Sequence, residues 1–186
     1  RAKAAIEDGS FVSEITPVIA KTRKGDKVIT TDEQPLKADI EKIKQLRPAF
    51  AKDGSVTAAN SSSISDGGAA LVLMTLSEAK RRSLNPLAVI RGHSTFAHEP
   101  AWFTTAPSPA IEKLLQKIEW SKDDVDLFEI NEAFAVVTMA AMRDLDIPHE
   151  KVNIHGGACA LGHPVGASGA RIIVTLLAAL KKKNMS

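Results

Sequence analysis

This 186-residue sequence has a single cysteine and no long apolar run. Its single cysteine, Cys159, excludes an intrachain disulfide and is compatible with a reducing compartment. No apolar run reaches the roughly 18 residues that a membrane-spanning helix requires. We therefore expect a soluble protein that has no membrane as a partner.

An excess of charge of one sign is also missing. The 24 Lys and Arg residues are balanced by 22 Asp and Glu residues, so the net charge of +2 gives no general indication of nucleic-acid binding. The main glycine-rich stretch lacks the Gly-Lys-Ser/Thr of a phosphate-binding loop and the Gly-x-Gly-x-x-Gly of a dinucleotide site. With 44% hydrophobic and 25% charged residues, the composition is that of an ordinary globular protein.

Glycine is abundant in one short stretch, residues 155–171 (HGGACALGHPVGASGAR), which holds five glycines and two histidines. Glycine adopts positive φ without steric cost, so such a loop turns sharply or approaches another group closely. Pro164 restricts His163 to an extended conformation. We expect a helix to begin near Ser168, with Ser168 as its N-cap, so that His163 lies at the positive end of the helix dipole. That position suits chemistry that develops negative charge.

The second half of the chain alternates strand and helix patterns, which indicates an α/β layered domain. Strands are expected at residues 87–92, 125–130 and 152–154, and helices at residues 109–118 and 133–145. Asn131 and His163 each stand where a strand gives way to a helix. In α/β sheets this edge is where active sites gather.

A second cluster of small residues, 55–68, precedes the apolar run 69–75. We expect the first to be a loop that offers hydroxyls to a ligand, and the second to be a strand buried on both faces. Ser77 is expected to cap a short charged helix. The Asn85-Pro86 pair is the best candidate for a domain boundary.

His163 and Asn131 are the main candidates for chemistry. An imidazole exchanges a proton near neutral pH and can bind an oxyanion, and a side-chain amide can orient water or donate to an oxyanion. Glu132 is either functional or a structural carboxylate tied to backbone N–H groups, and its residue type does not decide between the two.

The spacing of His155, Cys159 and His163 raises the possibility of a zinc site, because all three are zinc ligands. The intervening glycines prevent the regular helix that would align them, and no fourth ligand is evident, so we expect no metal. Cys159 stands between two alanines, and we expect it to pack as a small hydrophobic residue rather than to act as a nucleophile.

Two motifs together point to a known family. Residues 131–134 (NEAF) and the glycine-rich stretch 155–171 resemble segments of the thiolase family, and further thiolase-like segments follow the family's order over essentially the whole chain. These further segments are LRPAF (46–50), VTAAN (56–60), DGGAA (66–70) and VDLFEI (125–130).

The resemblance implies a coenzyme A-dependent acyltransferase with a five-layered αβαβα fold. Thiolases transfer an acyl group through a cysteine thioester, either condensing two acetyl-CoA molecules or cleaving a 3-ketoacyl-CoA. Coenzyme A or acetyl-CoA is then a substrate, and no cofactor is permanently bound. By motif match, His163 activates the cysteine and helps to bind the thioester oxyanion, while Asn131 holds a water in the same oxyanion hole.

The resemblance also implies a set of binding residues. Ser62 matches the serine at the pantetheine of coenzyme A, Phe103 falls where thiolases shape the acyl pocket, and the positions lining the pantetheine tunnel are Phe50, Ala58, Ala133 and Phe134. Residues 34–37 (QPLK) stand where many relatives have an arginine for the coenzyme A phosphate, and Ser63 stands where a glycine is common.

The nucleophilic cysteine's half of a thiolase and the terminal Cys-x-Gly segment have no counterpart here, and Cys159 matches neither. We therefore expect an incomplete α/β thiolase-like fold, mainly the C-terminal half. Its parts are expected to be a coenzyme A-binding loop-domain segment (1–63), the closing elements of the N-terminal half (64–85), and a C-terminal half truncated before Cys-x-Gly (86–186).

The expected partners are an acyl-CoA substrate, the remaining thiolase half and further copies in a homodimer or homotetramer, with no nucleic acid. The isolated chain is expected to be inactive. A cytoplasmic location is expected, with mitochondrial and peroxisomal ones left open. The alternative reading is a non-catalytic module that binds coenzyme A or a protein.

Overall fold

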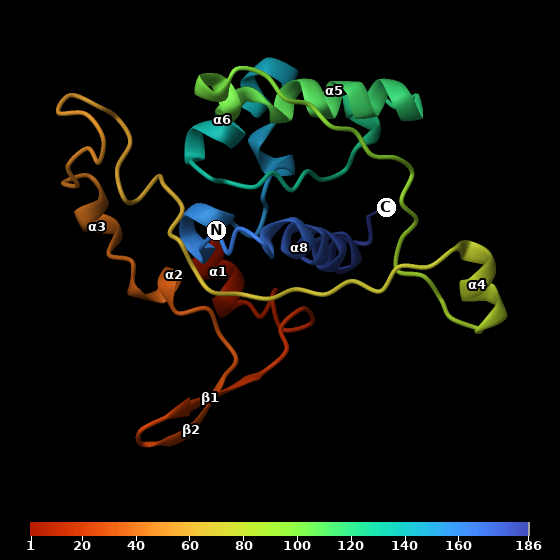
Figure 1. Cartoon of the computed structure of the whole chain (residues 1–186), viewed down its shortest axis with the longest axis horizontal. Helices are drawn as coiled ribbons and strands as arrows, with labels where there is room; N and C mark the ends of the chain where they lie inside the picture. Colours follow the sequence, from red (N-terminus) through yellow and green to blue (C-terminus); the bar gives the residue numbers. More distant parts are fainter. Residues whose placement is uncertain (186) are drawn as a thin grey trace.

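Helices pack around two apolar cores and one β-hairpin projects away from them in the computed structural model, which describes residues 1–185 (Figure 1). The α-helices are α1 (Ala2–Glu7), α2 (Gln34–Lys37), α3 (Ile40–Ile43), α4 (Leu76–Arg81), α5 (Pro107–Ile118), α6 (Ala135–Leu145), α7 (Ala158–Leu161) and α8 (Ser168–Lys183). The 3-10 helices are η1 (Pro100–Thr105), η2 (Lys122–Asp124) and η3 (His149–Lys151), and strands β1 (Val18–Thr22) and β2 (Gly25–Ile29) form the antiparallel hairpin.

The larger core lies beneath helices α5 and α6. Its buried members are Phe128, Ile130, Val137, Ala141, Ile147 and Val152. The expected strands 125–130 and 152–154 do not form as strands among the described residues; the two segments meet there through one isolated parallel bridge between Phe128 and Val152. The Phe128 amide donates to the Lys151 carbonyl at 2.8 Å. Because side chains alternate along an extended chain, Phe128 and Ile130 enter this core while Glu129 and Asn131 line a pocket on the α8 side.

The smaller core joins the start of the chain to α7. Ala2, Ala5 and Phe11 pack with Leu161 of α7. Gly156, at φ +85°, lies against α1 so closely that a Cβ there would be 2.7 Å from the Ala2 amide nitrogen. Glycine is therefore required at this position both for its conformation and for the close approach.

Helix α8 begins at Ser168, as the sequence predicts, but Ser168 is not its N-cap. The N-cap is Ala167, which makes no side-chain capping hydrogen bond. The helix ends at Lys183, its C-cap Asn184 has the left-handed conformation, and three lysines in the last turn complement the negative end of the dipole. No helix within residues 1–185 is long and apolar enough to cross a bilayer.

Helices α5 and α6 confirm the expected helices at 109–118 and 133–145, whereas the expected strands at 69–75 and 87–92 are wrong. Both segments are extended, but they form no ladder with any described residue. Val72 keeps 87% of its surface exposed, and Leu87 and Ile90 are also exposed. An extended segment becomes a strand only when a neighbour pairs with its backbone N–H and C=O groups, and the described chain supplies no such neighbour.

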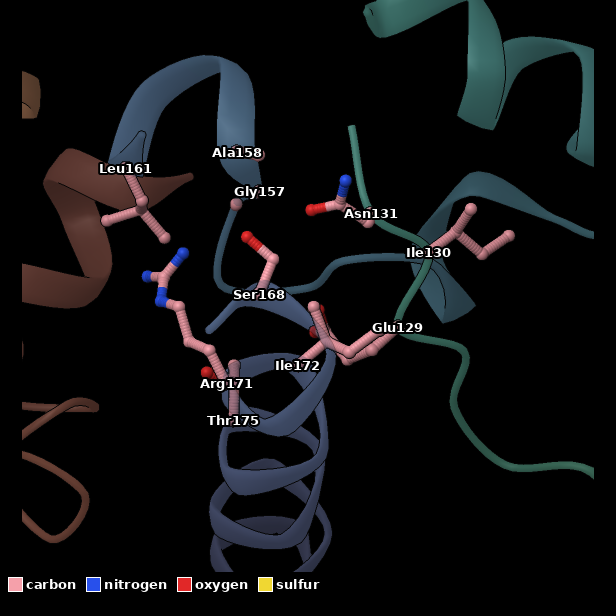
Figure 2. Close-up of a pocket in the computed structure, with 11 residues that line it drawn as sticks. Glu129, Ile130, Asn131, Gly157, Ala158, Leu161, Ser168, Arg171, Ile172 and Thr175 are labelled. Atoms are coloured by element: carbon pink, nitrogen blue, oxygen red, sulfur yellow. The ribbon is translucent and has the colours of Figure 1, made fainter. Parts of the chain in front are cut away.

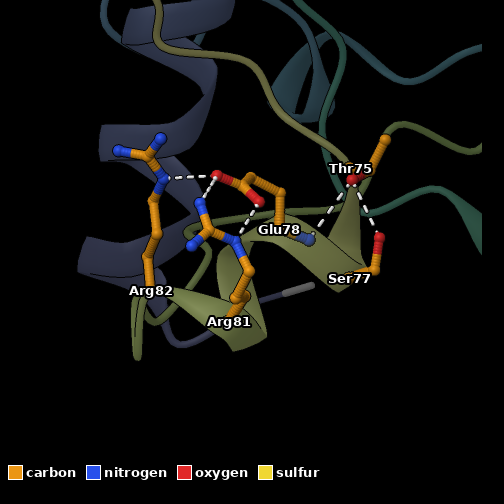
Figure 3. Close-up of polar contacts among 5 residues, drawn as sticks. All are labelled: Thr75, Ser77, Glu78, Arg81 and Arg82. Atoms are coloured by element: carbon orange, nitrogen blue, oxygen red, sulfur yellow. Dashed lines mark hydrogen bonds and ion pairs between the residues drawn. The ribbon is translucent and has the colours of Figure 1, made fainter.

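Helix α4 stands on its own between these two extended segments (Figures 1 and 3). Its N-cap is Thr75, whose hydroxyl accepts from the Glu78 amide at 3.2 Å, so the expected Ser77 cap is wrong by two residues. Glu78 binds Arg81 at 2.7 Å and Arg82 at 2.5 Å, which lowers the pKa of its carboxyl (Figure 3). Local capping and ion pairs therefore account for this helix.

Candidate functional site

His163 is positioned by backbone contacts between the glycine-rich stretch and the serine-rich loop. Gly162 precedes it at φ +90°, and a Cβ on Gly162 would collide with the Ser65 side chain. The His163 amide donates to the Ser63 carbonyl at 3.0 Å, and His163 forms a parallel bridge with Ile64. The two small-residue clusters that stand out in the sequence therefore meet at this histidine.

Both nitrogens of the His163 imidazole have partners. Nδ1 lies 2.6 Å from the Ser168 hydroxyl, and Nε2 lies 3.3 Å from Nδ2 of Asn131. His163 and Asn131 are 32 residues apart in the chain. The structure thus brings together the two residues that the sequence singles out for chemistry.

Asn131 is held by a residue that sequence reasoning missed, Asn153. The Asn153 amide oxygen accepts from the Ile130 amide at 2.8 Å, and its Nδ2 donates at 2.8 Å to the Ile130 carbonyl and to Glu132 Oε1. Asn153 is buried and has a φ of +45°. An asparagine inside the short expected strand 152–154 was the available signal, because Asn tolerates the left-handed region better than most residues.

Glu132 is a structural carboxylate, which resolves the question that its residue type leaves open. Besides Asn153, it accepts from the Cys159 amide at 3.2 Å, and a Cβ on Gly157 would collide with it. It therefore ties the strand end at Asn131 to the start of the glycine-rich stretch.

Cys159 is unsuited to act as a nucleophile. Its thiol donates to the Glu132 carbonyl at 3.7 Å. Burial, followed by the nearby Glu132 charge, raises the pKa of this thiol to about 12. Because the thiolate is the reactive form, a thiol with so high a pKa is inert near neutral pH.

His155 lies apart from His163 and contacts Phe11 edge-on, with ring centroids 5.9 Å apart. Its side chain is buried, and this burial lowers the pKa of the imidazole. Within the described part of the chain, no group of three or more His, Cys, Asp or Glu side chains is placed to hold a metal ion.

The residues matched to coenzyme A binding gather around the start of α6. Ser62 donates to the Ala133 carbonyl twice, from its amide at 3.0 Å and from its hydroxyl at 2.8 Å. Ala58 is exposed in the neighbouring turn, where the Asn60 carbonyl accepts from the Ala135 amide at 2.9 Å. The loop 57–63 is thus anchored along residues 133–135.

Three aromatic residues form the apolar part of this region. Phe134 meets Phe50 and Phe103 edge-on, at centroid distances of 6.1 and 6.3 Å. Phe50 and Phe103 are largely exposed. They come from separate parts of the chain and present an apolar surface beside the Ser62 hydroxyl.

A small pocket lies between Asn131, Ser168 and Arg171, with Glu129 on its wall (Figure 2). Burial, together with the Glu132 charge, raises the pKa of Glu129 to about 8. Sequence reasoning missed Glu129, because its alternation into this pocket is visible only once the neighbouring helix α8 is in place.

The chain matches known domains over nearly its full length: the thiolase N-terminal domain over residues 1–77 and the thiolase C-terminal domain over residues 84–186. It is 46% identical over 179 residues to the "Probable acetyl-CoA acyltransferase" of Staphylococcus aureus (strain MRSA252), with 95% of this chain and 46% of the relative covered. The chain therefore spans about half the length of the curated relatives it matches.

Solved thiolase structures resemble this chain in fold as well as in sequence. The acetyl-CoA acetyltransferase of Bacillus anthracis superposes with a TM-score of 0.95 and 48% identity, over 99% of this chain and 47% of that one. Human mitochondrial 3-ketoacyl-CoA thiolase superposes with a TM-score of 0.90 and 36% identity, again over 99% and 47%. The layered α/β arrangement is thus that of thiolases, and the chain belongs to the thiolase family.

Proposed function

We propose that this chain is part of a thiolase that transfers an acetyl or acyl group between coenzyme A thioesters through an acyl-cysteine. The observation that carries the proposal is the contact between His163 and Asn131, 3.3 Å apart at the start of α8. Thioester chemistry requires a base that deprotonates a thiol and hydrogen-bond donors that stabilise an oxyanion. The neighbouring imidazole of His163 and side-chain amide of Asn131 can supply both.

In the proposed mechanism, Nε2 of His163 removes the proton from a cysteine thiol supplied from outside this chain. The thiolate attacks the thioester carbonyl, and the carbonyl oxygen becomes an oxyanion. The new Nε2–H then donates to that oxygen, together with a water held by the Asn131 amide. Collapse of the intermediate breaks the bond between the carbonyl carbon and the coenzyme A sulfur, which takes the proton back from Nε2 and leaves as the thiol, and the acyl group stays on the cysteine.

We propose further that Ser62 contacts the pantetheine of coenzyme A and that Phe50, Ala58, Ala133 and Phe134 line its path, with Phe103 beside the acyl group. The hydrogen bonds of Ser62 to Ala133 and the ring contacts of Phe134 support this arrangement, because they gather a hydroxyl and an apolar surface in one place. The relatives' names support acetyl-CoA or a 3-ketoacyl-CoA as the substrate class.

The remaining half of a thiolase is the proposed partner, within a homodimer or homotetramer located in the cytoplasm. In this proposal residues 1–63 contribute to the coenzyme A site, 64–85 close the N-terminal half and 86–186 form the C-terminal half. The exposed apolar segments 69–75 and 87–92 support it, because they need neighbouring strands to cover them. The isolated chain is proposed to be inactive, since the thiol of its only cysteine has a pKa of about 12.

A chimera tests this function. Residues 1–186 replace the matching segment of the Bacillus anthracis enzyme, and thiolysis of acetoacetyl-CoA by coenzyme A is measured. His163→Ala is expected to lower kcat by at least about a hundredfold, the usual contribution of a general base, with a much smaller change in KM.

His149→Ala, which removes an exposed histidine on η3, is the matched control and is expected to leave kcat unchanged. The isolated chain provides the blank. Near-normal turnover of the His163→Ala chimera would refute the role of His163, and turnover by the isolated chain that survives Cys159→Ser would refute its proposed inactivity.

A further inference from the structure

Ser168 has a buried hydroxyl that does not cap its helix. The residue is 4% exposed, and the N-terminus of α8 receives no side-chain cap. Its hydroxyl contacts two groups: Nδ1 of His163 at 2.6 Å and the Pro164 carbonyl at 3.1 Å. Since neither contact satisfies a helix N–H group, the hydroxyl interacts with the histidine ring and does not cap the helix.

The direction of these hydrogen bonds follows from counting protons. A serine hydroxyl has one proton to donate and lone pairs to accept with, whereas a carbonyl only accepts. The Ser168 proton therefore goes to the Pro164 carbonyl, a common bond for serine to a residue four positions earlier. What the hydroxyl offers to Nδ1 of His163 is a lone pair, so Nδ1 carries a proton.

The contact of the other ring nitrogen, Nε2, also places the proton on Nδ1. Nδ2 of Asn131 is only a donor, so at 3.3 Å from Nε2 it requires a lone pair on that nitrogen. A neutral imidazole carries one proton and one lone pair, and which nitrogen holds the proton is set by the partner of the other. The Ser168 and Asn131 contacts thus favour one tautomer, with the proton on Nδ1.

We propose that Ser168 is a positioning residue that holds neutral His163 as the Nδ1–H tautomer and so keeps the Nε2 lone pair facing the site. The importance of this tautomer rests on the proposed function, in which Nε2 is the base. Nδ1–H can donate to Ser168 whether or not Nε2 has taken up a proton, so the ring keeps one orientation through proton transfer. Pro164, which restricts the backbone at His163, supports the same fixed geometry.

The test reads the tautomer directly, on the 186-residue chain without substrate. The histidines are labelled with ¹⁵N, and ring spectra are recorded at a pH at which His163 is neutral. We expect Nδ1 of His163 to give the signal of a protonated nitrogen and Nε2 that of an unprotonated one. In Ser168→Ala the Nε2–H form should appear beside the Nδ1–H form, because Nδ1–H loses its acceptor and free neutral histidine favours Nε2–H, while the Asn131 contact still favours Nδ1–H. Ser168→Thr, which keeps the hydroxyl, should restore the original pattern.

Thr175→Val is the matched control. Thr175 lies on the same helix, is 3% exposed, and donates its hydroxyl to Glu14 Oε1 at 3.0 Å. This substitution also removes a buried hydroxyl, but it should leave the His163 tautomer unchanged. The ring of His155, packed against Phe11, reports in the same spectra whether each variant is folded.

A protonated Nε2 in the original chain would overturn the proposal, because Ser168 would then donate to Nδ1. An unchanged tautomer in folded Ser168→Ala would also overturn it. Neither result depends on turnover, so a failure of the proposed function and a failure of this inference are distinguishable.

Discussion

Residues 125–131 and residues 69–75 both carry segments that the sequence predicts to be strands, but the structure buries the first and leaves the second largely exposed. The first segment is joined to Val152 by one parallel bridge at Phe128, and Phe128 and Ile130 are buried in the larger core. The second runs extended without a ladder partner among residues 1–185, and Val72 and Leu73 are exposed. A strand-like apolar pattern therefore indicates a segment that needs cover, but the presence of a bonded neighbour decides whether it is buried.

The boundary between the covered and uncovered regions runs through the site. Ile64, whose backbone forms the bridge with His163, has 99% of its surface exposed, whereas Ser168, which contacts the imidazole, is buried. The proposed base is thus supported by the buried Ser168 hydroxyl, while the side chain next to its backbone bridge is uncovered. This asymmetry supports the proposal that the thiol partner of His163 comes from outside the chain.

The largest expected contrast comes from making one substitution in both regions. Val152→Ala removes two methyl groups from a side chain that is 2% exposed in the larger core, and we expect it to lower the free energy of unfolding by about 2 to 3 kcal/mol. Val72→Ala should leave the free energy within about 0.5 kcal/mol of its original value, as for most surface changes. Urea titration of both variants is the measurement. Equal losses would contradict the division into covered and uncovered regions.

A smaller effect is expected from pH, because burial holds the folded-state pKa of Glu129 at about 8 against an ordinary value of 4.5. Between these values the unfolded chain releases the Glu129 proton while the folded chain keeps it. Stability therefore falls as pH rises from about 4.5 to 8 and levels off above. We expect Glu129 to account for a loss of about 1 to 2 kcal/mol between pH 5 and 8, less than the full linkage value of about 1.4 kcal/mol per pH unit.

Urea titration at several pH values checks this effect. Glu129→Gln should reduce the slope, although Glu14, whose pKa burial also raises, keeps part of it. Glu112→Gln, which changes an exposed carboxyl on α5, is the control and should retain the original slope. An unchanged slope in Glu129→Gln would show that Glu129 is solvated in the folded chain.

The features predictable from sequence are those that depend on local pattern. Helices α5, α6 and α8 follow from apolar spacing and from proline and glycine punctuation, and the resemblance of two motifs singles out His163 and Asn131. Their 3.3 Å contact agrees with the prediction from residue chemistry and with the prediction from the family resemblance.

The features that could not be predicted depend on contacts between residues that are distant in the sequence. Asn153 supports Asn131 from 22 positions away, and Ser168 serves His163 although its sequence context suggests a cap. Glu129 has a raised pKa only because α8 and Glu132 close around it. Likewise, the exposure of residues 69–75 depends on a neighbour, which no local pattern reveals.

Amide hydrogen exchange tests the central claim most directly, that residues 125–183 hold the site on a locally complete core while residues 69–75 and 87–92 require strands from elsewhere. We predict that in the isolated chain α6 and α8 are protected and the two extended segments exchange like unprotected peptide. In the Bacillus anthracis chimera the two segments should become at least about tenfold slower, because their amides then join a sheet. Slow exchange of both segments in the isolated chain, or equally fast exchange in the chimera, would contradict the claim.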